Sequence, residues 1–300
     1  MSIIILIYLT IIVQVYSDYI HLNKICDDNH EKEAIVTATV QSDFSTVKCL
    51  LDKGSSKIDT INSDGWSALL WAVASTQLDI VKLLLEHGAN PDIPNAFGDT
   101  PLMFAAHIGD IDILRLLINY GAKLGTENSY GKTTALMKAS IYGRLDCVIE
   151  LISKGSDINK QNNLGKTPLM LAASGGHENI VSYLIDKQAQ LDIRDDLKWT
   201  ALIAASVGGH ISTVKLLIDA KSSLNLQDHM GYTALLWATM EGHFEILKLL
   251  VEAGADISMR DNKKMHALYW AVKLNRVEIA KFLTEVRDRN LHLYKVMNEF

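Results

Sequence analysis

The sequence predicts an all-α repeat solenoid, and three observations carry this prediction. A turn followed by Thr-Pro-Leu or Thr-Ala-Leu recurs along the 300-residue chain. Each copy continues into an alanine-rich helix, a break that is often Gly-His, and an aliphatic second helix. One such unit cannot bury both of its apolar stripes alone, so neighbouring units must stack. The recurring turn residue is at Gly65, Gly98, Gly131, Gly165, Lys198, Gly231 and Lys264.

The spacing of these turns is regular, at 33 residues from Gly65 to Gly98, with one longer interval. The longer interval lies in "GKTTAL", where we place the extra residue at Thr133 or Thr134, beside the turn. A fixed period of this length is the signature of stacked helical repeats.

Each predicted element has a local reason, which "TPLMLAASGGHENIVSYLIDK" illustrates. Thr167 suits the N-cap of a first helix, and Pro168 suits its first turn, where the missing N–H costs nothing. Ala172 and Ala173 let neighbouring helices approach closely, and Gly176 can take the positive φ that ends the helix. The second helix carries one apolar stripe. Its members are Ile180, Val181, Leu184 and Ile185.

Four lysine or glutamine substitutions depart from this pattern. Gln188 and Lys221 replace the glycine that closes a second helix, while Lys198 and Lys264 replace the turn glycine. A non-glycine residue at positive φ costs about 1 kcal/mol. We therefore expect the repeats around residues 188–221 to open more readily than their neighbours.

Together these repeats resemble the ankyrin repeat family. Seven carry the signature, over residues 61–285, and a degenerate copy, "EKEAIVTATVQSDFSTVKCLLDKGSSKID", precedes them. The resemblance implies helix–turn–helix units joined by β-hairpin-like loops, with about eight repeats over residues 31–288. Residues 18–30 are then a short lead-in. Residues 289–300 are expected to form a capping tail with a short extra helix.

Catalysis, metal binding and cofactor binding are not favoured. His177, His210 and His243 recur one repeat apart, too far for one metal ion, so we interpret them as structural. The "GKT" stretches lack the upstream glycine of a phosphate loop. Acidic residues at repeated slots suit first helical turns. The sequence therefore predicts no enzyme, no metal and no cofactor.

Composition points the same way. Hydrophobic residues make up 48% of the chain and charged residues 21%, which is ordinary for a globular protein. The net charge of −6 comes without a basic tract, so nucleic acid is not an expected partner. Three cysteines are too few for a disulfide framework. We expect Cys49 and Cys147 to be small buried hydrophobes, and the state of Cys26 stays open.

The resemblance implies a protein partner, bound by hairpin tips and by the concave side of the first helices. Aromatic residues and methionine at these positions suggest interface anchors. The alternative is that each ring packs on the next hairpin, and Trp71, Phe104, Trp237 and Trp270 inside first helices are expected to be core. The candidate partner-binding residues are Trp66, Phe97, Tyr130, Tyr142, Trp199, Met230 and Tyr232.

The predicted function is a non-enzymatic protein–protein interaction scaffold. A structural or self-associating array is one alternative, and an exported effector that acts on host proteins is another. The sequence does not identify the partner.

The first 17 residues, "MSIIILIYLTIIVQVYS", hold no charged side chain. The apolar run from Ile3 to Val13, with Val15 and Ser17 before Asp18, fits a signal peptide cut after Ser17. A membrane anchor would need about 20 apolar residues, and an apolar cap on the first repeat would need a polar face. We expect secretion or delivery to an endomembrane lumen; a cytoplasmic protein is the alternative. A membrane is a partner only if this segment is an uncleaved anchor.

Overall fold

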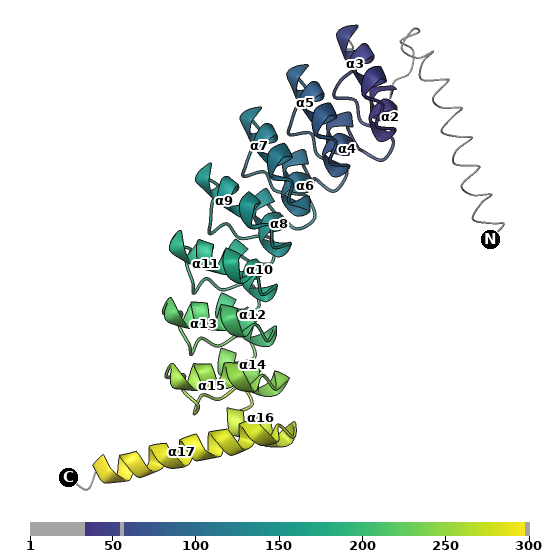
Figure 1. The fold of residues 1–300 in the computed structure, drawn as a ribbon. Coiled ribbons are helices and arrows are strands. Elements are labelled where there is room, and N and C mark those ends of the chain that lie inside the picture. The colour runs from purple at the N-terminus through teal and green to yellow at the C-terminus, as the bar shows by residue number, and fades with distance from the viewer. Residues whose placement is uncertain (1–33, 55–56, 298–300) are drawn as a thin grey trace, which may run out of the picture. The chain divides into compact units, whose positions relative to one another are not determined.

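The computed structural model of the chain describes residues 34–54 and 57–297, with side chains up to residue 289 (Figure 1). The chain divides into two compact units, Met1–Ala135 and Leu136–Phe300. All regular elements of the described residues are helices, accompanied by two isolated antiparallel bridges, Ile61–Ser67 and Arg260–His266. The predicted signal peptide, lead-in and Cys26 lie outside the described residues.

The first unit consists of helix pairs joined by short breaks. First helices pack on first helices, α2 on α4 and α4 on α6, and second helices pack likewise, α3 on α5 and α5 on α7. The pairs are α2 (Ala34–Val40) with α3 (Phe44–Asp52), α4 (Ala68–Ala74) with α5 (Leu78–Glu86), and α6 (Pro101–Ile108) with α7 (Ile111–Asn119).

The second unit repeats this arrangement and begins within α8. First helices α10, α12, α14 and α16 pack in series, as do second helices α9, α11, α13, α15 and α17 (Figure 1). The pairs are α8 (Ala135–Ile141) with α9 (Leu145–Ser153), α10 (Pro168–Ser174) with α11 (Glu178–Asp186), α12 (Ala201–Val207) with α13 (Ile211–Asp219), α14 (Ala234–Glu241) with α15 (Phe244–Glu252), and α16 (Ala267–Lys273) with α17 (Val277–Met297).

The core of the second unit follows from the repeat. One alanine of each first helix, at positions 172, 205, 238 and 271, is fully buried, so that adjacent first helices approach closely. The second helices contribute fully buried aliphatic side chains such as Val181 and Leu184. The start of α10 confirms the predicted cap, because Thr167 Oγ1 accepts from the amide of Met170 at 3.3 Å. This packing confirms the all-α repeat solenoid.

The one-residue insertion lies inside a hairpin. In the preceding hairpin the amide of Asn95 donates to the carbonyl oxygen of Asp99, whereas the amide of Asn128 donates to that of Thr133, one residue further on. Thr133 and Thr134 are both buried, and Thr134 directly precedes α8. The prediction that either is the extra residue is therefore wrong, because both hold places that the regular repeat already needs.

The insertion moves the turn residue and pushes out a ring. Lys132, with φ of 50°, takes the left-handed conformation in place of the predicted Gly131. The longer loop projects Tyr130 into solvent, where it is 86% exposed.

The four departures from glycine do have positive φ, as predicted. The φ angles are 63° at Gln188, 62° at Lys198, 69° at Lys221 and 66° at Lys264. At the matching glycine Gly155, a Cβ would meet nothing within 4 Å. The cost at Gln188 and Lys221 is therefore backbone strain and not crowding.

We expect Gln188→Gly and Lys221→Gly each to stabilise the second unit by about 1 kcal/mol, because glycine relieves the positive-φ strain. Hydrogen exchange in α11 and α13 measures the effect. Gln188→Ala is the matched control, since it shortens the side chain and keeps the strain. Unchanged exchange in both glycine variants would contradict this explanation.

The C-terminal tail differs from the prediction. Residues after 289 were expected to form a short separate helix, but α17 continues without a break to Met297. Arg287 falls one repeat after Gly254, and no glycine or proline interrupts the helix there. Among the described residues, no helix is both long and apolar enough to cross a lipid bilayer.

Candidate protein-binding surface

A buried carboxylate organises each hairpin of the second unit. Asp228 Oδ1 accepts from the amides of Met230 (2.8 Å) and Tyr232 (2.9 Å). Asp195 and Asp261 make the same pair of bonds in their own hairpins. All three carboxylates are buried, so the hairpin tips are held in fixed positions by bonds to an ionised acceptor.

Two of these carboxylates also hold a tryptophan. Asp228 Oδ2 accepts from Trp237 Nε1 at 2.9 Å, and Asp261 Oδ2 accepts from Trp270 Nε1 at 2.9 Å. In both pairs the tryptophan follows the aspartate by nine residues. Each hairpin is thus tied to the first helix that follows it.

The residue after the turn packs inward in the second unit. Trp199 lies 5.5 Å from Trp237 between ring centroids, and Tyr232 lies 5.3 Å from Trp237 and 6.1 Å from Trp270. We call Trp199, Tyr232, Trp237 and Trp270 the aromatic stack. The rings meet edge to face, the geometry that aromatic pairs favour.

Packing in the stack removes Tyr232 from the surface. The side chain is only 9% exposed. Burial, and after it the negative charges of Asp261 and Asp228, raise the pKa of Tyr232 above its ordinary 10.0. The expectation that Tyr232 is an exposed tip is wrong, because the next repeat supplies Trp270 to cover it.

The first unit contains a smaller cluster of the same kind. Trp66 lies 4.9 Å from Trp71 and 5.1 Å from Phe104 between ring centroids. All three side chains are half-buried. Trp71, Phe104, Trp237 and Trp270 are therefore not core, as had been expected, but lie half-exposed on the first helices.

The residue before the turn points outward in the second unit. Leu164, Leu197 and Met230 are 54%, 49% and 40% exposed. Their carbonyl oxygens accept from amides of the next hairpin at 3.0–3.1 Å, so consecutive tips are joined through the backbone. We call Leu164, Leu197 and Met230 the tip ridge.

The other candidate residues are exposed as predicted. In the first unit, Phe97 is 63% exposed, and its carbonyl oxygen accepts from the amide of Ser129, next to the exposed Tyr130. In the second unit, Tyr142 is exposed directly after α8. Trp66 and Trp199 are half-buried and present only part of their rings.

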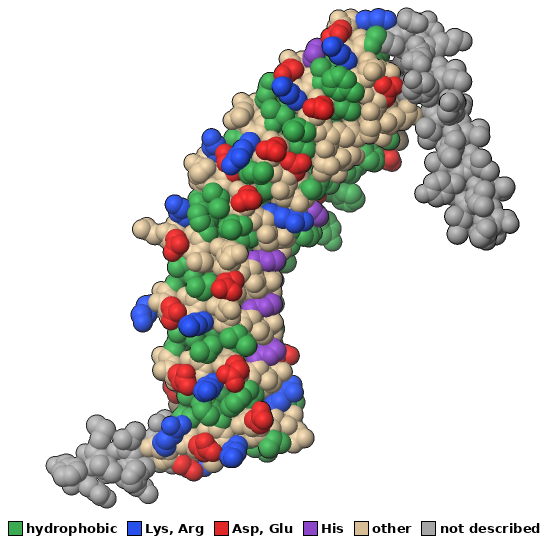
Figure 2. Space-filling model, viewed as in Figure 1, with side chains coloured by type: hydrophobic (Ala, Val, Ile, Leu, Met, Phe, Trp, Pro, Cys, Tyr) green, Lys and Arg blue, Asp and Glu red, His purple; other side chains and the backbone are tan. Residues whose placement is uncertain are grey.

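The repeated histidines have a structural role. Nε2 of His177, His210 and His243 contacts the carbonyl oxygen of Ile141, Ser174 and Val207, each at the end of the preceding first helix. A carbonyl only accepts, so Nε2 carries the proton and donates. Figure 2 shows histidine side chains in a column on this unit. No group of three or more potential metal ligands occurs among the residues that the structure describes.

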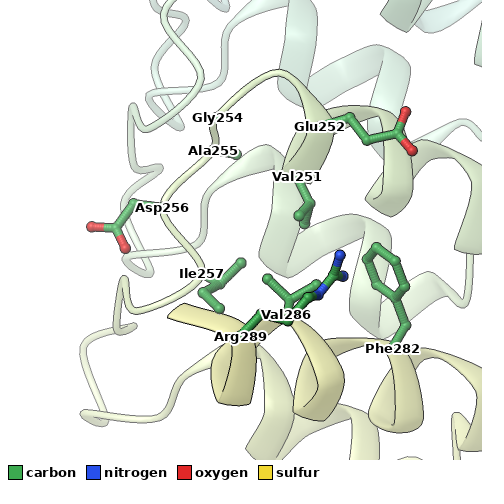
Figure 3. Close-up of a pocket in the computed structure, with 9 residues that line it drawn as sticks. All are labelled: Val251, Glu252, Gly254, Ala255, Asp256, Ile257, Phe282, Val286 and Arg289. Carbon is green, nitrogen blue, oxygen red and sulfur yellow. The ribbon is translucent and has the colours of Figure 1, made fainter. Parts of the chain in front are cut away.

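A surface pocket of about 610 Å³ lies between the turn after α15 and α17 (Figure 3). It exists because α17 continues where a second helix would otherwise end. Val251, Ile257, Phe282 and Val286 point toward one another with Arg289, while Glu252 and Asp256 point away. No carboxylate is aimed into this pocket, so its lining offers no acid–base pair.

The buried aspartates and their tryptophans are the residues that sequence reasoning missed. A signal for them exists, because Asn62, Asn95, Asn128, Asn162, Asp195, Asp228 and Asp261 recur at the repeat spacing. An acceptor side chain at a fixed place before each turn is typical of an Asx-type turn.

Stacked helix pairs joined by backbone-paired hairpins define a repeat protein of the solenoid class. A family model described as "Ankyrin repeats (3 copies)" matches residues 11–95, 89–162, 145–228 and 208–292. These matches span most of the sequence, and the chain belongs to the ankyrin repeat family. Ankyrin repeats generally mediate protein–protein interaction.

Two similar proteins bear the name "Ankyrin repeat, SAM and basic leucine zipper domain-containing protein 1". The one from Saimiri boliviensis boliviensis is 31% identical over 157 residues, and the one from Ateles geoffroyi is 32% identical over the same length. Each alignment covers 51% of this chain and 26% of the relative. The similarity therefore spans about a quarter of those proteins.

Proposed function

We propose that the chain is a non-enzymatic scaffold that binds a protein partner through the tip ridge and the half-exposed aromatic stack beside it. The tip ridge is the observation that carries this proposal. Three apolar side chains stand in solvent at successive tips, although the same hairpins bury the residue two places later in at least one case, Tyr232. Exposed apolar side chains in a fixed row are typical of an interface.

The rigidity of the tips supports the same proposal. A surface held by buried carboxylates and backbone bonds loses little conformational entropy when a partner binds. The half-exposed Trp199 and Trp237 add aromatic area of the type that dominates binding energy. Neither feature requires a metal or a cofactor.

The test begins with a photo-reactive residue at Leu197, which cross-links the native partner for identification; the affinity for that purified partner is then measured. Leu197→Ala combined with Met230→Ala is expected to weaken binding at least tenfold, in line with the loss of interface anchors. Thermal unfolding should be unchanged. Lys215→Ala is the matched control, since Lys215 is exposed on α13, a second helix. Equal affinity of the double variant and the control would sink the site assignment.

Self-association is a second candidate, favoured by the open end of α16. Tyr269, Val272 and Leu274 are exposed there, and Met265 and Leu268 line a surface pocket of about 320 Å³ beside them. Light scattering decides between the two. A molar mass that rises with concentration, and falls back in Val272→Glu, would favour the array.

Export is the localisation that we propose. Residues 1–17 have the composition of a signal peptide. Cys49 is disulfide-bonded, a state typical of secreted and lumenal proteins. Under this proposal the scaffold meets its partner outside the cytosol, or as an effector inside a host cell. N-terminal sequencing of the mature protein should give Asp18 first; Met1 or Ser2 would exclude cleavage.

A further inference from the structure

The cysteines of this chain are not equivalent. Cys49 on α3 is disulfide-bonded, whereas Cys147 on α9 is a fully buried thiol. The expectation that both are buried hydrophobes is therefore right for Cys147 and wrong for Cys49, which is half-exposed. The chain contains one further cysteine, Cys26.

We propose that Cys26 and Cys49 form an intrachain disulfide bond that fastens the segment around Cys26 over the outer face of α3. The bond is a covalent cap on the first repeat. It goes beyond the binding function, which rests on other residues in the second unit.

The outer face of α3 offers a place for this segment. Phe44, Ser45, Lys48, Cys49 and Asp52 lie along one side of the helix and line a surface pocket of about 460 Å³. The opposite side carries the buried residues that pack into the core. In α5, the helix that packs against α3, the position matching Cys49 is the buried Leu83. The first repeat thus leaves open a face that later repeats cover.

The length of chain is sufficient. Eight steps separate Cys26 from Ala34, where α2 begins. An extended segment of that length spans about 28 Å, and packed helices such as α2 and α3 lie about 8–10 Å apart. Cys26 can therefore reach Cys49 without unwinding either helix.

The oxidation balances through thiol–disulfide exchange. One cysteine, as the thiolate, attacks the disulfide of a dithiol–disulfide oxidoreductase and forms a mixed disulfide. The second cysteine then attacks its sulfur, the S–S bond of the chain forms, and the oxidoreductase leaves as a dithiol. The two thiol protons and two electrons of the chain thus pass to that protein, which an oxidising compartment supplies.

The bond should stabilise the end of the repeat array. Terminal repeats need a cover because one side of each has no neighbour. Closing the loop between residues 26 and 49 restricts the unfolded chain, which raises the free energy of unfolding of α2 and α3. Reduction is then expected to loosen this repeat and to leave the second unit unchanged.

Peptide mapping of the full chain, produced through an oxidising compartment and alkylated without reduction, tests the pairing. The expected result is one linked species that joins the peptides with Cys26 and Cys49, with Cys147 alkylated only after unfolding. Alkylated Cys26 in the unreduced chain, or a Cys49–Cys49 bond between two chains, would overturn the proposal. Cys147→Ala is the control and should keep the linked species.

Hydrogen exchange tests the consequence. Amides of α2 and α3 should exchange roughly 100-fold faster after reduction. Cys26→Ser, Cys49→Ser and the double variant should each show the same increase without reductant, because either change removes one shared bond. Exchange in α12 to α15 is the internal reference. If Cys26→Ser leaves α2 and α3 as protected as in the unchanged chain, the cap does not exist.

Discussion

Replacing Asp228 by alanine is expected to lower the free energy of unfolding of the second unit by about 3 kcal/mol, since each lost hydrogen bond to a buried group contributes about 1 kcal/mol. The carboxylate accepts from the amides of Met230 and Tyr232 and from the indole of Trp237. All three donors lose their acceptor together. Denaturant unfolding, with hydrogen exchange of α12 to α15 to locate the change, measures the loss.

Asp228→Asn is the matched control. Its side-chain oxygen can still accept from the two amides, but its nitrogen cannot accept from Trp237 Nε1. The expected loss is then about 1 kcal/mol, confined to the indole bond. If asparagine destabilises as much as alanine, the two backbone bonds do not fix the hairpin.

Replacing Asn62 by aspartate is expected to have the opposite sign in the first unit. Asn62 Oδ1 accepts from the amides of Asp64 and Trp66, as Asp228 does in its own hairpin. Trp71 follows Asn62 by nine residues, yet its Nε1 is a buried donor without a partner in the structure. A carboxylate supplies the missing acceptor, so we expect a gain of about 1–2 kcal/mol.

A double-variant cycle isolates this bond. Asn62→Asp should stabilise the chain that carries Trp71 and should have no effect when Trp71 is replaced by phenylalanine. Denaturant midpoints give both differences. A gain that persists with Trp71→Phe would show that the added charge acts elsewhere, through Trp66 or the solvent.

The repeat itself could be predicted from the sequence, because its causes are local. Threonine caps, N-terminal prolines and apolar stripes act within one helix pair, and they recur at a fixed period. The strain at Gln188 and Lys221 could be predicted for the same reason. The insertion was misplaced because Gly131 attracts the turn in sequence, whereas the backbone pairs Asn128 with Thr133 and gives the turn to Lys132.

The candidate surface could be predicted only in part. Phe97, Tyr130 and Met230 are exposed, but Tyr232 is buried against Trp237 and Trp270. Whether a tip ring faces solvent depends on the side chain that the next repeat places opposite it. A single-residue pattern does not contain that information. The acidic residue that precedes each tip would have indicated where the hairpin is fixed.

The backbone pairing of successive tips turns the tip ridge into a ruler. Stacked helices advance about 8–10 Å per repeat, and an extended chain advances about 3.3 Å per residue. A partner segment that ran extended along Leu164, Leu197 and Met230 would therefore gain about three of its own residues for each tip. Recognition by this edge would then favour partners whose apolar side chains recur at every third position, in step with the spacing of the repeats.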